Sequence, residues 1–164
     1  MYIQRNIFLG DLVKGFRVHS VVALLCPRQC GKTTIANFHS DKIIEQDMPV
    51  KTIDLEDPNH LRQLENSKLA LESLKELIVI DEIQNKPELF QLLRVLVDKN
   101  KDKQQYLILG SASRELISQS SENMADRVAF IELTPFNSMK ISSSNGLWLR
   151  GSYFLFIKIN RRQL

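Results

Sequence analysis

The sequence predicts an α/β fold in which five strands form a mostly parallel sheet with helices on both faces. Two observations support this prediction. Short apolar segments of strand length alternate with longer segments whose apolar residues recur at helical spacing. Polar residues also follow directly on the apolar segments at 21–25 and 77–80, and ligands of open parallel sheets bind beyond the carboxyl ends of strands. Strands joined through helices in this way lie parallel, with right-handed crossovers.

Continuous apolar runs bounded by loop residues predict where the strands lie. The expected strands cover residues 20–25, 50–55, 77–80, 106–109 and 128–133.

Helices are expected within residues 1–19, at 32–45, at 58–75 and after residue 88, where apolar residues recur at helical spacing up to Lys99. Asp57 before Pro58 predicts a helix start, with the aspartate as N-cap and proline in the first helical position. Asn85 with Glu88 resembles a capping box at the start of the last helix, with Pro87 in its first turn.

The segment between the first strand and its helix has the pattern of a phosphate-binding loop. In such a loop, successive backbone N–H groups surround a phosphate and the helix N-terminus adds partial positive charge. Lys32 would reach the outer phosphates, and the Thr33 hydroxyl would help to coordinate Mg²⁺. The alternative is a chance Gly-Lys-Thr in a loop. The predicted binding set is Arg28, Gln29, Cys30, Gly31, Lys32, Thr33 and Thr34.

Cys26 stands where this motif calls for glycine. A Cβ at that position could strain a turn that glycine makes freely, so we expect weakened rather than abolished binding.

Asp81 and Glu82 form a second motif at the end of the apolar segment 77–80. An aspartate at the carboxyl end of a strand, across from a phosphate-binding loop, is suited to holding Mg²⁺, and the next glutamate to polarising the attacking water. Alone, the pair would be equally compatible with a buried strand that ends in exposed acids. Together with the loop, about fifty residues upstream, it favours a metal-bound nucleotide site.

Two further residues are candidates for contact with the phosphates. Ser111 follows the fourth strand, where its hydroxyl could sense the terminal phosphate; a helix cap by Ser111 or Ser113 is an equally good interpretation. Arg127 precedes the fifth strand, and its guanidinium could point at the phosphates or pair with a carboxylate.

Composition describes an ordinary globular protein of 164 residues, 43% hydrophobic and 25% charged. No apolar run approaches the ~20 residues that span a bilayer, and the first residues lack the apolar core of a secretory signal. The two cysteines, Cys26 and Cys30, lack the further ligands that zinc needs. Two incidental thiols in a reducing cytoplasm are favoured over a redox-sensitive loop. We therefore expect a cytoplasmic protein.

The charge is distributed unevenly. All 19 acidic residues lie in residues 1–137 with 17 Lys or Arg, whereas residues 138–164 hold five basic residues and no acid. The body of the protein therefore has no excess of cations, which argues against a nucleic-acid surface there. A nucleic-acid-directed module would rest on the basic tail alone.

With these motifs in place, the chain resembles a prokaryotic AAA-type ATPase family whose members carry a C-terminal domain of unknown function. The resemblance covers roughly residues 5–151, and the first two motifs carry most of its specificity. The matching runs are Pro27-Arg28-Gln29 with Gly31-Lys32-Thr33-Thr34, Ile80-Asp81-Glu82-Ile83-Gln84, Leu109-Gly110-Ser111-Ala112-Ser113, Leu133-Thr134-Pro135-Phe136 and Leu147-Trp148-Leu149-Arg150-Gly151.

The resemblance implies a P-loop NTPase fold of the additional-strand type, with the Ser111 strand between the phosphate-loop strand and the Asp81 strand. It also implies ATP rather than GTP. The chain departs from the family at Cys26 and at Asp126, both of which stand where the family usually has glycine. Beyond Gly151 the resemblance stops.

We therefore expect an ATPase-like domain at 1–137, followed at 138–164 by a tail that begins a missing or frameshifted C-terminal domain. The leading functional interpretation is a domain that binds ATP with Mg²⁺ and hydrolyses it, acting with an unidentified protein partner. The alternative is a nucleotide-dependent switch that does not hydrolyse ATP, or an inactive truncated remnant.

Overall fold

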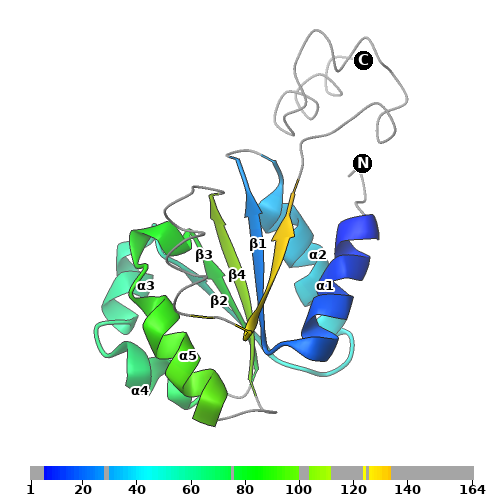
Figure 1. Cartoon of the computed structure of the whole chain (residues 1–164). Helices are drawn as coiled ribbons and strands as arrows, with labels where there is room; N and C mark the ends of the chain where they lie inside the picture. The colour runs from blue at the N-terminus through cyan, green and yellow to red at the C-terminus, as the bar shows by residue number, and fades with distance from the viewer. Residues whose placement is uncertain are drawn as a thin grey trace, which may run out of the picture.

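The computed structural model describes residues 6–27, 30–74, 76–99, 104–111, 124 and 126–133. Its centre is one sheet in the order β2-β3-β4-β1-β5, in which every paired strand is parallel (Figure 1). The predicted strands and the α/β architecture are confirmed. The strands are β1 Val21–Cys26, β2 Val50–Asp54, β3 Leu77–Asp81, β4 Gln105–Ser111 and β5 Val128–Glu132.

The strand order places β4 between β1 and β3, as the family resemblance implies. The register then fixes which residues meet at the carboxyl edge of the sheet. Cys26 at the end of β1 lies opposite Ser111 at the end of β4, and Asp81 at the end of β3 lies opposite Asp54 of β2. Both sequence motifs therefore reach the same edge.

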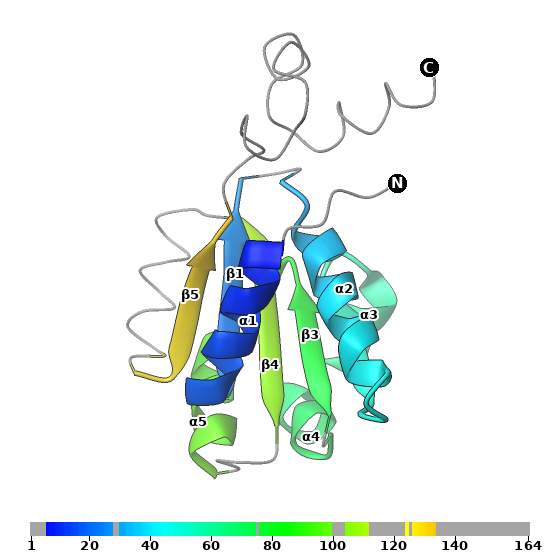
Figure 2. The same ribbon diagram turned by 90° about the vertical axis from the view of Figure 1, so that its right-hand side faces the viewer.

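Two helices, α1 Asn6–Val18 and α2 Lys32–Ile44, cover one face of the sheet (Figure 2). Alternate residues of a strand point to opposite faces, so each strand supplies a separate set of side chains to this layer. Leu12 of α1 and Ile35 of α2 pack in the same buried cluster as Val22, Leu24 and Val79. This layer fixes the helix that begins at the phosphate-binding motif.

Three helices, α3 Pro58–Gln63, α4 Ser67–Glu72 and α5 Leu89–Lys99, cover the opposite face. Leu93 and Leu96 of α5 are fully buried against Ile78, Ile80 and other residues of a second apolar cluster. Helices on both faces are thus confirmed. This layer holds β3, the strand that ends in the acidic motif, in place from the other side.

Two local predictions were wrong. The single helix expected at 58–75 is broken after Gln63, because the Asn66 side chain accepts the backbone N–H of Leu69 and starts a new helix. The capping box at Asn85 does not form: α5 begins only at Leu89, and the Asn85 side-chain amide donates to the carbonyl of Leu55 at 3.3 Å. The Asn85 side chain therefore links two loops by a hydrogen bond and does not cap a helix.

The helix start at Asp57 is confirmed, since its carboxylate accepts the N–H of Asn59 at 2.8 Å. Within the described ranges, no helix is long and apolar enough to cross a membrane. Arg28, Gln29, Ser113 and the tail at 138–164 lie outside the described residues, so the predictions that concern them stay predictions.

Candidate functional site

Gly31 forms the junction between the loop and α2. Its backbone has φ 88° and ψ 31°, the left-handed conformation, and it occupies the N-cap position of the helix. A side chain at this position would be strained, whereas glycine adopts the conformation freely. Helix α2 therefore begins at Lys32, so its first N–H groups and its positive dipole end lie at the carboxyl edge of the sheet.

Lys32 is unusual among lysines because it is only 7% exposed. None of the described residues forms an ion pair with its ammonium group. A buried cation without a counter-ion is costly, and an anion bound beside it would remove that cost. The surroundings of Lys32 thus fit the phosphate role that the sequence predicts.

Thr33 and Asp81 come from motifs 48 residues apart, and the fold brings them into contact. The Thr33 hydroxyl donates to Oδ2 of Asp81 at 3.0 Å, while the N–H of Glu82 donates to Oδ1 at 2.8 Å. A hydroxyl and a carboxylate side by side are the hard oxygen ligands that Mg²⁺ prefers. These two residues therefore fit the predicted metal site.

The Asp81 carboxyl is 9% exposed, and burial raises its pKa above the ordinary value. The hydrogen bonds from Thr33 and from the Glu82 backbone lower the pKa but do not cancel the effect of burial, and the charge of Lys32 lowers it a little further. A cation bound beside Asp81 would favour the ionised form of this buried carboxyl. The electrostatics and the geometry agree.

Glu82 has a left-handed backbone, with φ 54° and ψ 47°. This conformation is rare for a residue with a long side chain and is a form of strain found at functional sites. The Gln84 side-chain amide donates to Oε2 of Glu82, and its carbonyl oxygen accepts the backbone N–H of Ser111 at 3.3 Å. Gln84 therefore links the candidate catalytic carboxylate to the end of β4.

The sequence pattern alone predicts no role for Gln84. The signal available was its place two residues after Glu82 in the matching motif, but its partners depend on the pairing of β3 with β4. Ser111 itself is the last residue of β4, next to Cys26, at the same edge as the other site residues. Its expected contact with a terminal phosphate stays a prediction.

Arg127 is not brought to this site. It precedes β5, whose first residue lies opposite Val21 at the start of β1, so it is near the amino edge of the sheet. Along the strand direction, Arg127 lies six residue steps from the level of Cys26, which is roughly 20 Å. Its guanidinium binds Asp98 of α5 through two hydrogen bonds, Nε to Oδ1 at 2.7 Å and Nη2 to Oδ2 at 3.2 Å. Of the two interpretations of Arg127, the structure shows the pairing with a carboxylate.

Asp126, the other departure from the family pattern, has φ 60°. A glycine would adopt this left-handed conformation freely, and aspartate tolerates it better than most residues. The turn is thus kept without the glycine.

The backbone strain expected at Cys26 is not found. Cys26 is the last residue of β1, and its φ is not positive. Its side chain is fully buried, and burial is the main cause that raises the pKa of the thiol to about 12. Cys30 is buried beside it, and the two cysteines form no disulfide. Both sulfurs pack within the apolar layer under α2.

Comparison with known proteins agrees with this geometry. The family model described as AAA domain matches residues 18–141. The chain is 40% identical over 153 residues to the uncharacterized protein Rv2008c of Mycobacterium tuberculosis and equally to Mb2031c of Mycobacterium bovis. Each match covers 92% of this chain and 34% of the relative, so the chain spans about a third of their length.

Solved structures share the fold at low identity. AMPPCP-bound DnaA from Aquifex aeolicus aligns with a TM-score of 0.60 and 12% identity, covering 95% of this chain and 58% of DnaA. The Hsp104–ADP complex of S. cerevisiae gives 0.62 and 17%, covering 92% and 24%. A Walker-type ATPase of Pyrococcus abyssi gives 0.60 and 14%, covering 99% and 59%. At such identities, the similarity shows the fold.

Proposed function

The chain belongs to the AAA-domain family of ATPase-like, nucleotide-binding proteins, and on that premise we propose that it binds ATP with Mg²⁺ and hydrolyses it. The observation that carries the proposal is the contact between Thr33 and Asp81 beside the buried Lys32. We assign this activity to the domain at 1–137.

Nucleotide binding uses the residues at the start of α2. The Lys32 ammonium pairs with the outer phosphates, which removes the cost of burying an uncompensated charge. The N–H groups of the first helical turn face the same place and carry the positive end of the helix dipole. Arg28, Gln29 and Cys30, in the loop before Gly31, are proposed to contact the phosphates as well, as their positions in the motif predict.

Thr33 and Asp81 are the residues that would hold Mg²⁺. The metal, when bound, neutralises phosphate charge and stabilises the charge that develops during transfer. Asp81 must be ionised to serve as ligand, and its raised pKa means that the empty site holds a proton more tightly than an ordinary aspartate does. Metal binding is therefore coupled to loss of that proton.

In this proposal Glu82 polarises the water that attacks the terminal phosphate. Its carboxylate accepts a hydrogen bond from Gln84, which fixes the side chain although the backbone is in an unfavourable conformation. A carboxylate held in this way can accept a proton from the attacking water as the bond to the terminal phosphate breaks. Gln84 acts as a positioning residue in this proposal.

The same contact supports a second candidate, a nucleotide-dependent switch that does not turn over. The Gln84 amide holds one oxygen of Glu82, and a carboxylate held there through every state of the nucleotide would not act on water. A domain held in this state would bind ATP and release no phosphate. Phosphate release at saturating ATP distinguishes the two candidates. A switch would bind ATP but release phosphate no faster than the uncatalysed rate, whereas an ATPase would release it faster.

Calorimetry with Mg·ATP tests the proposal directly. We expect saturable binding by the wild type and a loss of roughly tenfold or more in affinity for Lys32→Ala, because a hydrogen-bonded charge pair is removed. Lys68→Ala, which removes an exposed lysine from α4 on the other face, is the matched control and should bind like the wild type. Equal affinity of the wild type and Lys32→Ala would contradict the assignment.

A further inference from the structure

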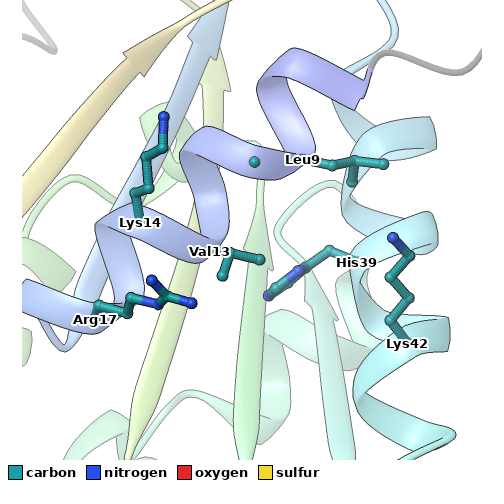
Figure 3. Close-up of a pocket in the computed structure, with 7 residues that line it drawn as sticks. Leu9, Val13, Lys14, Arg17, His39 and Lys42 are labelled. Atoms are coloured by element: carbon teal, nitrogen blue, oxygen red, sulfur yellow. The ribbon is translucent and has the colours of Figure 1, made fainter.

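A second hollow lies between α1 and α2, away from the carboxyl edge of the sheet (Figure 3). It has a volume of about 400 Å³, which falls within the usual range of small-ligand pockets. None of the candidate nucleotide-site residues that the structure describes lines it. His39, at its floor, comes seven residues after Lys32, about 10 Å along the axis of α2.

The lining of this pocket is cationic. Lys14 and Arg17 come from α1 and Lys42 from α2, and among the described residues no acidic side chain lines the pocket. Asp11 lies 3.6 Å from Lys14 and partly neutralises it. Within the described part of the chain, neither Arg17 nor Lys42 forms an ion pair. Two exposed cations without an acidic partner among the described residues therefore line the same concave surface, one on each helix.

His39 supplies the observation that points to a ligand. It is only 4% exposed, and its Nε2 has no hydrogen-bond partner among the residues that the structure describes. The ring stacks on Phe16 of α1, with centroids 5.5 Å apart and planes inclined by 5°, and Figure 3 shows it pointing from α2 toward α1. A buried ring nitrogen without a partner is costly, and a ligand in the pocket that the ring turned to meet would remove that cost.

Burial lowers the pKa of His39, and the nearby charge of Lys42 lowers it further. The imidazole is therefore neutral near pH 7, so it offers one N–H donor and adds no repulsion to the two cations. A group that accepts hydrogen bonds and carries negative charge matches all three side chains at once.

We propose that this pocket binds a small organic anion, with Arg17 and Lys42 pairing with its charge and the His39 ring turning so that its buried Nε2 hydrogen-bonds to it. The rest of the ligand would be apolar, because Leu9 and Val13 form part of the wall. Phosphate monoesters and carboxylates share this chemistry. The proposal is independent of nucleotide binding at Lys32.

NMR of the histidine side chains is a direct test, because the chain contains only three histidines and a His39→Gln variant identifies the signal of interest. The probes are phenyl phosphate and benzoate, one for each anion class, with neutral benzyl alcohol as control. We expect at least one anion to shift the His39 imidazole signals saturably, and benzyl alcohol to leave them unchanged. No saturable shift with either anion would overturn the proposal.

Two variants show whether the shift comes from this pocket. Arg17→Gln with Lys42→Gln should weaken the effect at least roughly tenfold, whereas Lys68→Gln with Arg94→Gln, the same charge change on the other face, should not. Gly10→Phe should abolish the effect, because Gly10 lines the pocket, a Cβ there meets no atom within 4 Å, and we expect the ring to occupy the space of the ligand.

Lys32→Ala separates the two sites. The His39 response should persist in this variant, because the pocket does not use the phosphate-binding loop. A response that disappears in Lys32→Ala, or that survives Gly10→Phe in a protein with a wild-type circular dichroism spectrum, would contradict the proposal. The charge variants keep the test decisive even where Gly10→Phe does not fold.

Discussion

The two edges of the sheet treat charge in opposite ways. At the amino edge, Arg127 and Asp98 neutralise each other through two hydrogen bonds in a partly exposed pair. At the carboxyl edge, Lys32 and Asp81 are both buried, and neither forms an ion pair with a described residue. In the first arrangement each charge has an opposite charge beside it. In the second, a bound anion and cation would supply the missing partners, which is why the carboxyl edge and not the amino edge is the candidate site.

The largest expected effect is on turnover at Glu82. Replacing Glu82 by Gln removes the carboxylate that would accept a proton from water, so we expect the ATP hydrolysis rate to fall roughly 10²–10⁴-fold with affinity nearly unchanged. Phosphate release and calorimetry on the same samples measure both quantities. Glu88→Gln, an exposed carboxylate outside the site, is the matched control. Wild-type turnover in Glu82→Gln would remove this residue from the chemistry.

Asp81→Asn should separate binding from stability. Asparagine can still accept the Glu82 N–H, and its amide can donate to the Thr33 hydroxyl in place of accepting from it, so we expect the empty protein to be more stable at neutral pH because no charge is buried. The same change should abolish the dependence of ATP affinity on Mg²⁺. Chemical denaturation and calorimetry with and without the metal check the two effects. A less stable empty variant would show that the carboxylate is already compensated.

The pH dependence of stability tests the raised pKa of Asp81 in a second way, with Asp81→Asn as the reference. Because the pKa of Asp81 is raised, the folded state binds its proton more tightly than the unfolded state does. This contribution to stability is present below the ordinary value near 3.8 and is lost as pH rises through the raised pKa. The difference in unfolding free energy between the wild type and Asp81→Asn should therefore grow with pH across that window. A constant difference would contradict the assigned pKa shift.

The side-chain contacts at the carboxyl edge of the sheet can be predicted from the sequence far better than those at the amino edge. Strands such as 77–80 are continuous apolar runs, and parallel strands joined by helices must end at one edge, so the meeting of Thr33 with Asp81 follows from the pattern. The pairing of Arg127 with Asp98 depends instead on where α5 ends relative to β5. This relative position cannot be predicted from any local sequence pattern. The partners of Gln84 likewise depend on the register of neighbouring strands.

Cys26→Gly should act on stability and not on affinity. The sequence alone suggested that glycine would relieve a strained turn and tighten binding, but Cys26 has strand geometry and its side chain is fully buried. We expect a loss of about 1–2 kcal/mol in unfolding free energy, from the flexibility of glycine and the lost packing. Cys26→Ala, which keeps a Cβ, should lose less. Tighter ATP binding by Cys26→Gly would restore the strain hypothesis.

The smallest effect is expected at Arg127. It tests whether the ion pair at the amino edge is independent of the candidate site at the carboxyl edge. If the pair with Asp98 is complete in itself, Arg127→Gln should leave ATP affinity and turnover unchanged and lower the melting temperature slightly. The pair is partly exposed, with side chains 31% and 46% accessible, so high salt should remove most of that difference. Asp98→Asn should behave like Arg127→Gln, and the double variant should be no worse than either single one, because both changes remove the same interaction. A tenfold or greater loss of turnover in Arg127→Gln alone, with Asp98→Asn unaffected, would mean that this guanidinium leaves its carboxylate to act on the phosphates. The contrast between the two edges would then describe only the empty state.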